Sequence, residues 1–164
     1  MGERLTGADV RKIEAEIEER KLVLRPELIQ AVKEARAQGD LSENFEYYAA
    51  KREKNRNESR IAYLERMLKF ATIMEDRAAA DEVGINKSVE VYFIDDDESE
   101  RYKIVTGIRG DTTAGRVSIE SPLGKALLGH KVGDLVHVAL PKGGYDLEIR
   151  AIEADDSDDE IRSF

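Results

Sequence analysis

Two carboxylates three residues apart, Asp40 and Glu43, are the side chains of this sequence best suited to chemistry. They lie in residues 39–44, which read GDLSEN. Carboxylate oxygens suit Mg²⁺, but two are too few for a metal cage built by this chain alone. A site here would have to be completed by another macromolecule. The structural alternative is that Asp40 or Ser42 caps a following helix, while Glu43 complements its positive dipole end.

Several other kinds of site are excluded by composition. The chain has no cysteine, which excludes disulfides, thiolate zinc sites and a cysteine nucleophile. Its two histidines, His130 and His137, argue against a Ser-His-Asp triad or a histidine-rich metal cluster. Neither a phosphate-binding GxxxxGK[ST] loop nor a GxGxxG motif after a strand occurs. Because no stretch reaches the roughly 18 apolar residues of a membrane span, we expect a cytoplasmic protein without a membrane partner.

The net charge of −9 is concentrated in the second half of the 164-residue chain. Residues 1–76 carry 15 Lys and Arg against 16 Asp and Glu, whereas residues 77–164 carry 11 against 19. A strongly acidic chain is a poor general binder of nucleic acid, because the phosphate contribution needs clustered cations. Six of the acids lie in residues 153–160, and we expect the acidic tail, residues 155–164, to be disordered and solvated.

The elements that position the carboxylates are helices. Apolar residues at helical spacing begin after Thr6, a predicted N-cap with Asp9 three residues on, and continue past Pro26, which should kink the helix or start a new one. The pattern stops at residues 39–40 and resumes near Ser42 or Glu43. Residues 1–76 are therefore predicted to form an antiparallel coiled-coil hairpin, about 50 Å long, with its tip near residues 39–44.

The far part of this hairpin contains a fully polar stretch, residues 51–60 (KREKNRNESR), with five cations and two acids. The positions that continue the apolar seam fall on Asn57 and Lys54. Polar seam residues weaken a coiled coil but can set its register. The stretch is either a solvated helix face or a basic stripe that faces an acidic partner or RNA.

After residue 84 the apolar period changes to two, which is typical of strands. Five strands are predicted at residues 88–94, 101–107, 116–120, 135–140 and 146–152. Ser121 and Pro122 begin a short helix that Gly129 ends. The fold class is thus α+β: the helical hairpin of residues 1–76, a linker at 77–84, and an antiparallel sheet domain with one short helix at 85–154, followed by the tail.

The tip sequence resembles a known family. Residues 34–51, EARAQGDLSENFEYYAAK, are similar to the EAR..GDL.EN.EY.AA+ signature of the bacterial GreA/GreB transcript-cleavage factors. Residues 25–29 (RPELI), 59–61 (SRI) and 64–65 (LE) also fit, as do 121–129 (SPLGKALLG) and 132–134 (VGD) in the second half. The likeness covers nearly the whole chain in the right order.

The resemblance implies an FKBP-like second domain that docks on RNA polymerase through a region including Ser121 and Pro122, while the coiled coil enters the secondary channel. Asp40 and Glu43 would be the catalytic tip pair, sharing a Mg²⁺ with the polymerase active site. The polymerase would then hydrolyse its own backtracked nascent RNA near the 3′ end, so the chain is not an enzyme by itself. The resemblance assigns tip support to Asn44 and Tyr47, and RNA contacts to Arg36 and Lys51, with Arg52 as a neighbouring addition.

Three alternatives remain at this point. A same-fold regulator could occupy the channel of the polymerase without stimulating cleavage, although the intact Asp40 and Glu43 argue against that class. A prolyl isomerase or chaperone is suggested by the FKBP-like half, but its few aromatic residues argue against a prolyl pocket. A purely structural coiled-coil adaptor would be indifferent to neutralising the tip. One departure from the signature is Phe45, where many family members carry a small residue. We expect a monomer.

Overall fold

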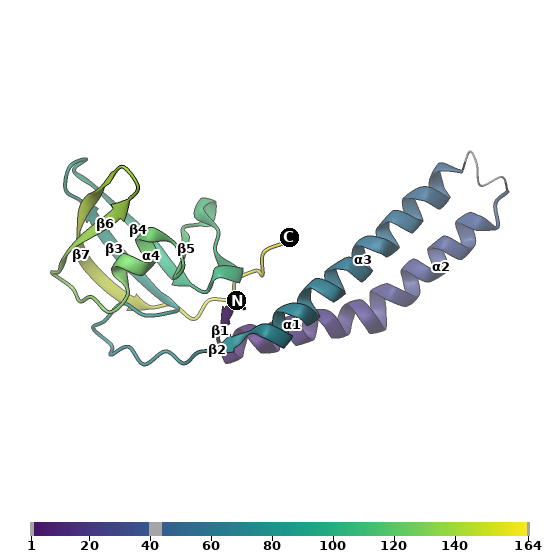
Figure 1. Cartoon of the computed structure of the whole chain (residues 1–164), viewed down its shortest axis with the longest axis horizontal. Helices are drawn as coiled ribbons and strands as arrows, with labels where there is room; N and C mark the ends of the chain where they lie inside the picture. Colours follow the sequence, from purple (N-terminus) through teal and green to yellow (C-terminus); the bar gives the residue numbers. More distant parts are fainter. Residues whose placement is uncertain (1, 40–43, 164) are drawn as a thin grey trace. The chain divides into compact units, whose positions relative to one another are not determined.

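The computed structural model describes residues 2–39 and 44–163 (Figure 1). Within this range, residues 2–73 and 74–163 form two compact units, which are described separately below. No helix in the described ranges is both long enough and apolar enough to cross a membrane.

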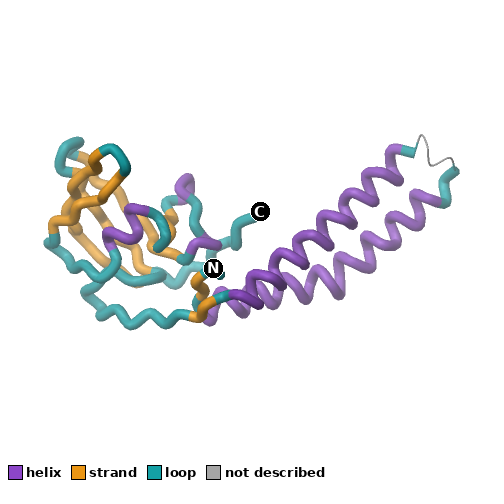
Figure 2. The backbone as a smooth tube through the Cα atoms, in the orientation of Figure 1, coloured by secondary structure: helices purple, strands orange, loops and turns teal. Residues whose placement is uncertain are grey.

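The first unit is a helical hairpin (Figure 2). One arm runs through α1 (Gly7–Glu19), a five-residue π-helix η1 (Arg20–Leu24) and α2 (Arg25–Arg36), and the other is α3 (Phe45–Phe70). The predicted cap at Thr6 is confirmed, since its side chain accepts from the Asp9 N–H at 3.1 Å and Asp9 accepts from the Thr6 N–H at 3.0 Å. At 1.5 Å per residue, the 26 residues of α3 extend about 39 Å.

The irregularity in the first arm comes at the predicted proline. Pro26 has no N–H to donate one turn back, and it lies in the first turn of α2, where this absence is tolerated. The chain reaches this position through η1, whose register is wider by one residue: the Arg25 N–H donates to the Arg20 carbonyl. Of the two predicted outcomes at Pro26, a kink or a new helix, the structure has a new helical segment, which begins one residue earlier at Arg25.

Packing within the hairpin is concentrated near its base. Ile13 and Leu64 are fully buried, and Ile61 and Met67 are nearly so. The base is also closed by a short parallel pairing of β1 (Arg4–Leu5) with β2 (Thr72–Ile73), which the sequence did not predict. Two-residue strands carry too little periodicity to be recognised in a sequence.

Beyond this apolar base the hairpin seam is polar. Asn57, predicted as a polar seam residue, is 3% exposed. Its side-chain amide donates to the Arg20 carbonyl at 3.1 Å and its oxygen accepts from Arg20 Nη1 at 3.0 Å. One turn nearer the base, Arg60 Nε donates to Glu16 at 2.8 Å. These bonds connect the two arms and fix their register, as polar seam residues can.

The second unit is a five-stranded sheet in the order β5-β4-β3-β7-β6 (Figures 1 and 2). The strands are β3 (Lys87–Phe93), β4 (Glu98–Val105), β5 (Arg116–Ser118), β6 (Leu135–Leu140) and β7 (Gly143–Ala154). All five predicted strands are present. However, the expectation of a wholly antiparallel sheet is wrong at one edge, because β5 pairs with β4 in parallel.

The parallel edge has a local cause in the chain between β4 and β5. Two 3₁₀ turns, η3 (Gly107–Arg109) and η4 (Thr112–Ala114), replace a tight hairpin there. Gly115 then adopts φ +73°, a left-handed conformation that favours glycine. The chain therefore returns along the same direction as β4 before it reaches α4 (Pro122–Leu127).

One apolar cluster holds the sheet domain together. It is formed by alternating side chains of the strands and by Leu127 of α4. Its buried members are Val83, Ile85, Val89, Val91, Ile104, Val117, Ile119, Leu127, Val136, Val138, Leu147 and Ile149.

The acidic tail differs from the sequence-based expectation. Rather than being wholly solvated, residues 155–163 follow the surface of the sheet domain, where the Asp155 N–H donates to the Asn86 carbonyl at 2.8 Å. The Arg162 N–H donates to the Ile108 carbonyl at 2.7 Å, and Asp159 is only 8% exposed. The physical reason is a pair of cations on the domain that pair with the tail carboxylates.

Candidate functional site at the hairpin tip

The candidate site lies where α2 ends and α3 begins. Asp40 and Glu43, the predicted catalytic pair, lie outside the described residues, as do Leu41 and Ser42. What the structure describes is the frame on either side of them: Arg36 and Gly39 on one arm, and Asn44 onward on the other. Gly39 adopts φ +121°, a conformation that L side chains rarely take, so the chain leaves the first arm through a position suited to glycine.

Asn44 connects the two arms at the tip. Its side-chain oxygen accepts from the Tyr47 N–H at 2.9 Å and thereby caps α3. Its amide nitrogen donates to the Ala35 carbonyl at 2.6 Å, which satisfies a carbonyl in the last turn of α2. One amide therefore closes both helix ends and sets the distance between the points where the tip segment leaves and returns.

The identity of this cap corrects a prediction. The structural alternative held that Asp40 or Ser42 caps the second helix, but the cap is Asn44 and the helix begins at Phe45, two or three residues later than expected. A side chain that caps a helix uses its oxygen to accept from a backbone N–H, and that oxygen is then less available for other ligands. Since Asn44 fills this position, Asp40 is not needed for it.

Tyr47 supports the same frame from the α3 side. It is 9% exposed, its ring packs edge-on against Tyr48 with centroids 5.3 Å apart, and the Arg36 guanidinium lies 5.6 Å from its ring centroid. Arg36 Nη2 also donates a long hydrogen bond, 3.5 Å, to the Tyr47 hydroxyl. This hydrogen bond, with the charge of Lys51, lowers the pKa of Tyr47 from its ordinary value. Asn44 and Tyr47 thus lie where tip support was predicted.

The three predicted RNA-contacting cations are exposed near this frame. Arg36 belongs to the last turn of α2, while Lys51 and Arg52 lie in the second turn of α3 and beyond. Arg36 contacts Tyr47, and Lys51, four residues further along α3, is near enough for its charge to lower the pKa of Tyr47. No described interaction connects Arg52 to them. Phe45, the departure from the signature, is 86% exposed at the first helical position.

Comparison with known proteins decides the family. Residues 3–73 match the family model described as "Transcription elongation factor, N-terminal", and residues 78–154 match "Transcription elongation factor, GreA/GreB, C-term". The chain belongs to the GreA/GreB family of transcription elongation factors.

Curated relatives agree with this assignment. Over 150 residues the chain is 47% identical to transcription elongation factor GreA of Streptococcus gordonii, covering 91% of this chain and 94% of the relative. GreA of Streptococcus pneumoniae (serotype 19F, strain G54) is 46% identical over the same shares. Among solved structures, GreA factor homolog 1 (Gfh1) of Thermus thermophilus is 29% identical, covers 94% of this chain and 100% of its own, and has a TM-score of 0.44.

A Mg²⁺ at the tip of this GreA/GreB chain would depend on Asp40 and Glu43 for its protein ligands. Among residues 2–39 and 44–163, no group of three or more His, Cys, Asp or Glu side chains could hold a metal ion. The predicted pair, Asp40 and Glu43, lies outside these ranges and offers two hard oxygen donors separated by two residues in the sequence. This pair fits a metal that keeps most of its ligands elsewhere.

The predicted docking residues of the second unit have structural roles in α4. The Ser121 hydroxyl accepts from the Gly124 N–H at 3.1 Å and donates to the Ser118 carbonyl at 2.7 Å, and Pro122 occupies the first turn. Gly124 cannot carry a Cβ, because that atom would lie 1.9 Å from the Ser118 carbonyl oxygen. The SPLG motif therefore fixes α4 closely on the end of β5, a rigid surface element of this family member.

Sequence reasoning missed one polar cluster. Lys103 and Arg109 are each buried on the sheet domain, and both pair with Asp159 of the tail. The available signal was Lys103 itself, a lysine within the apolar strand sequence YKIV, followed by an acidic segment that could neutralise it.

Proposed function

We propose that this chain binds bacterial RNA polymerase, inserts its hairpin into the secondary channel and stimulates the polymerase's own endonucleolytic cleavage of backtracked nascent RNA. The family assignment supports a role in transcription elongation. The observation that carries the finer proposal is Asn44, which closes both helix ends at the tip. Because Asn44 is the N-cap of α3, neither Asp40 nor Ser42 is needed for that task.

The two carboxylates supply the chemistry in this proposal. Asp40 and Glu43 would offer oxygen ligands to a Mg²⁺ shared with the polymerase active site, and the bound ion would lower the pKa of an attacking water. The chain's own contribution is position. The Asn44 bridge and the packed Tyr47 hold the returning helix, so that both carboxylates would be presented to the metal together.

The cations around the tip would engage the nascent RNA 3′ end. Arg36 and Lys51 flank Tyr47, and Arg52 lies next to Lys51 on the exposed surface of α3. Their charges complement a backbone phosphate, whereas the carboxylates alone would repel it. In this proposal the cations would meet the RNA backbone, while Asp40 and Glu43 would meet the metal.

The second unit would serve as the docking platform on the polymerase, through a surface that includes Ser121 and Pro122. Its short helix is firmly fixed to the sheet by the Ser121 hydrogen bonds. We propose a cytoplasmic monomer that activates the polymerase's hydrolytic activity and is not an enzyme by itself, since its two carboxylates complete an active site only within the complex.

The test is RNA length in a halted, backtracked elongation complex with Mg²⁺. We expect the wild-type chain to shorten the RNA, and Asp40→Asn and Glu43→Gln each to abolish the effect while retaining polymerase binding. Glu53→Gln removes an exposed carboxylate from the same arm, away from the tip, and should cleave like wild type.

The outcomes separate the possibilities. If the wild-type chain binds the polymerase and leaves the RNA intact, the chain is a regulator that occupies the channel without stimulating cleavage. If it fails to bind, the proposal is wrong. If Glu53→Gln loses cleavage as completely as Asp40→Asn, the tip carboxylates have no special role.

A further inference from the structure

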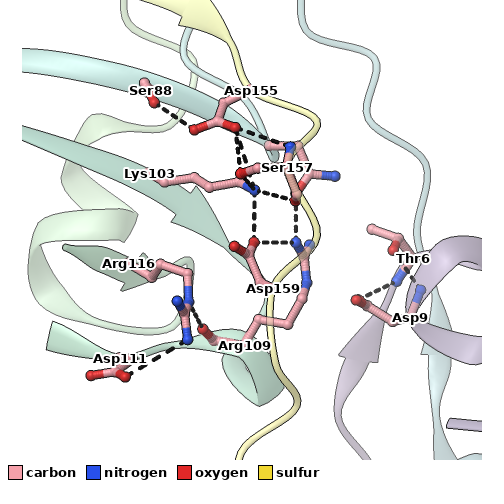
Figure 3. A network of polar contacts seen from close by, with 11 residues as sticks. Thr6, Asp9, Ser88, Lys103, Arg109, Asp111, Arg116, Asp155, Ser157 and Asp159 are labelled. Carbon is pink, nitrogen blue, oxygen red and sulfur yellow. Dashed lines mark hydrogen bonds and ion pairs between the residues drawn. The ribbon is translucent and has the colours of Figure 1, made fainter. Parts of the chain in front are cut away.

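The acidic tail holds two cations of the sheet domain (Figure 3). Lys103 Nζ donates to the Asp159 carboxylate at 2.7 Å, and Arg109 Nη1 donates to the same oxygen at 3.1 Å. Lys103 also donates to the Ser157 carbonyl at 2.8 Å and to its hydroxyl at 3.1 Å. A single carboxylate therefore receives two charged donors from two different elements, β4 and η3.

These charged groups are almost removed from water. The side chains of Lys103 and Asp159 are each 7% exposed, and that of Arg109 is 8% exposed. Two buried cations without a counter-ion are costly, because desolvation is not offset by an opposite charge. The cation pair thus favours occupation by an anion, and in this chain the anion is the tail.

The tail is recognised as a peptide and not only as a charge. Its backbone N–H groups at Asp155 and Arg162 donate to the Asn86 and Ile108 carbonyls at 2.8 and 2.7 Å. The Asp155 carboxylate accepts from the Ser88 hydroxyl at 3.0 Å. The surface therefore binds the peptide backbone at two points, and it binds two carboxylates that are four residues apart. This is the pattern expected for an extended acidic peptide.

The family match includes the two cations but not the tail that pairs with them. The match to the GreA/GreB C-terminal domain ends at residue 154, so Lys103 and Arg109 lie inside it and the tail lies beyond it. Residues 77–154 carry ten Lys and Arg against fourteen Asp and Glu, a net charge of −4. This net charge opposes any long polyanion, so a ligand must be held by the local Lys103–Arg109 pair and by main-chain hydrogen bonds, which favours a short peptide over RNA.

We propose that Lys103 and Arg109 form a carboxylate-binding site for an acidic peptide segment of a partner protein, which the chain's own tail fills in cis. The tether between β7 and Asp159 is four residues, which gives the tail a high effective concentration at the site. A partner must therefore displace the tail, and weakly binding acidic segments are excluded. The site is independent of the hairpin tip.

The test uses a fluorescent peptide with the sequence of residues 153–164 as the probe. Asp155→Asn/Asp159→Asn in the full chain weakens the tail in cis, and we expect this variant to bind the probe at least tenfold more tightly than wild type. Asp156→Asn/Glu160→Gln is the matched control: it removes the same charge at the same spacing from two exposed side chains, and should bind the probe like wild type. Adding Lys103→Gln to the first variant should abolish binding.

A second measurement uses the unmodified chain, which does not depend on any variant folding. Excess probe should speed hydrogen exchange at the Asp155 and Arg162 amides, since both are released with the tail. The proposal is overturned if exchange is unchanged in saturating probe, if Lys103→Gln leaves binding intact, or if the released site binds a single-stranded RNA in preference to the peptide. Because the assay contains no polymerase, its result is separate from that of the cleavage assay.

Discussion

In the sheet domain, twelve buried apolar side chains form a single cluster, whereas the described part of the hairpin unit buries seven, six of them along its two long arms. Beyond the polar seam residue Asn57, towards the tip, only Ala35 and Tyr47 of those seven remain. The outer hairpin is instead connected by hydrogen bonds between side chains and backbone, at Asn57 and Asn44.

This difference follows from what each region can bury. A sheet covered by a helix excludes water from one whole face, so burial alone stabilises it. Two helices side by side exclude water only along a narrow seam, and the remaining surface stays polar. The hairpin therefore needs specific polar bonds to fix its register, while the sheet domain needs a filled core. Substitutions in the two regions should fail in different ways.

The largest effect is expected in the core of the sheet domain. Leu147→Ala removes a fully buried side chain from β7 and should lower the free energy of unfolding by about 2–5 kcal/mol. Leu135→Ala on the neighbouring strand is the control, because that side chain is 69% exposed and its loss should change stability by less than about 0.5 kcal/mol. The loss of unfolding free energy in both variants is measured by urea unfolding, with hydrogen exchange of the strand amides as the probe. Equal losses would show that burial does not govern this domain.

The second effect tests the polar seam of the hairpin. Glu16→Gln removes the negative charge that accepts from the nearly buried Arg60. Because the Glu16 side chain is itself 25% exposed, we expect a cost of about 2 kcal/mol. Hydrogen exchange along α1 and α3 measures the loss. Glu53→Gln, which breaks a pair between two exposed side chains of α3, should leave the hairpin nearly unchanged.

The same carboxylate gives the hairpin a defined pH dependence. Burial opposes ionisation of Glu16, but hydrogen bonds from Arg60 and Arg20 outweigh it and hold its pKa below the ordinary 4.5. A lowered folded-state pKa contributes stability above pH 4.5 that is lost as the pH falls through the lowered value. Acid should therefore loosen the wild-type hairpin below this pH, and Glu16→Gln should flatten that part of the profile.

The contrast between the two regions also decides what the sequence could predict. The helical and strand periods were clear in the sequence because each arises from one continuous buried face. Ile13 and Leu64 lie in the hairpin seam, whereas Val89 and Val91 lie in the sheet core. The caps at Thr6 and Ser121 were recognisable because they are local, joining residues three apart.

Features that depend on distant residues were not recognisable. The pairing of β4 with β5 is parallel because of two 3₁₀ turns that carry no strong periodic signal. The burial of Lys103 requires Asp159, which lies 56 residues away. At the tip, Asn44 was assigned a supporting role only through the family signature. Its hydrogen bond to the Ala35 carbonyl joins two helices, and helix propensity, which is a local property, does not predict contacts between helices.

A third, smaller effect is expected at that bridge. Asn44→Ala removes the cap of α3 and the bond to α2, and should cost about 1 kcal/mol, largely at the tip. The loss should appear as faster hydrogen exchange in the first turn of α3, with slower RNA cleavage if the tip acts as proposed. Asn55→Ala is the control: this exposed residue lies inside the helix, where alanine is the better helix former. If both variants exchange alike, Asn44 does not organise the tip.

The smallest effect on folding is expected at Phe45. This residue is best compared with Phe70, at the other end of the same helix. Phe45 and Phe70 are the first and last residues of α3, with 86% and 58% of their surfaces exposed. Either change to alanine should alter the free energy of unfolding by less than about 0.5 kcal/mol. If the tip enters the polymerase as proposed, only Phe45 becomes buried there, and burial of such a side chain contributes about 1.5 kcal/mol or more. Phe45→Ala should then raise the concentration needed for half-maximal RNA cleavage about tenfold, while Phe70→Ala should not. Equal behaviour of the two variants in the cleavage assay would place the apolar contact elsewhere on the arm.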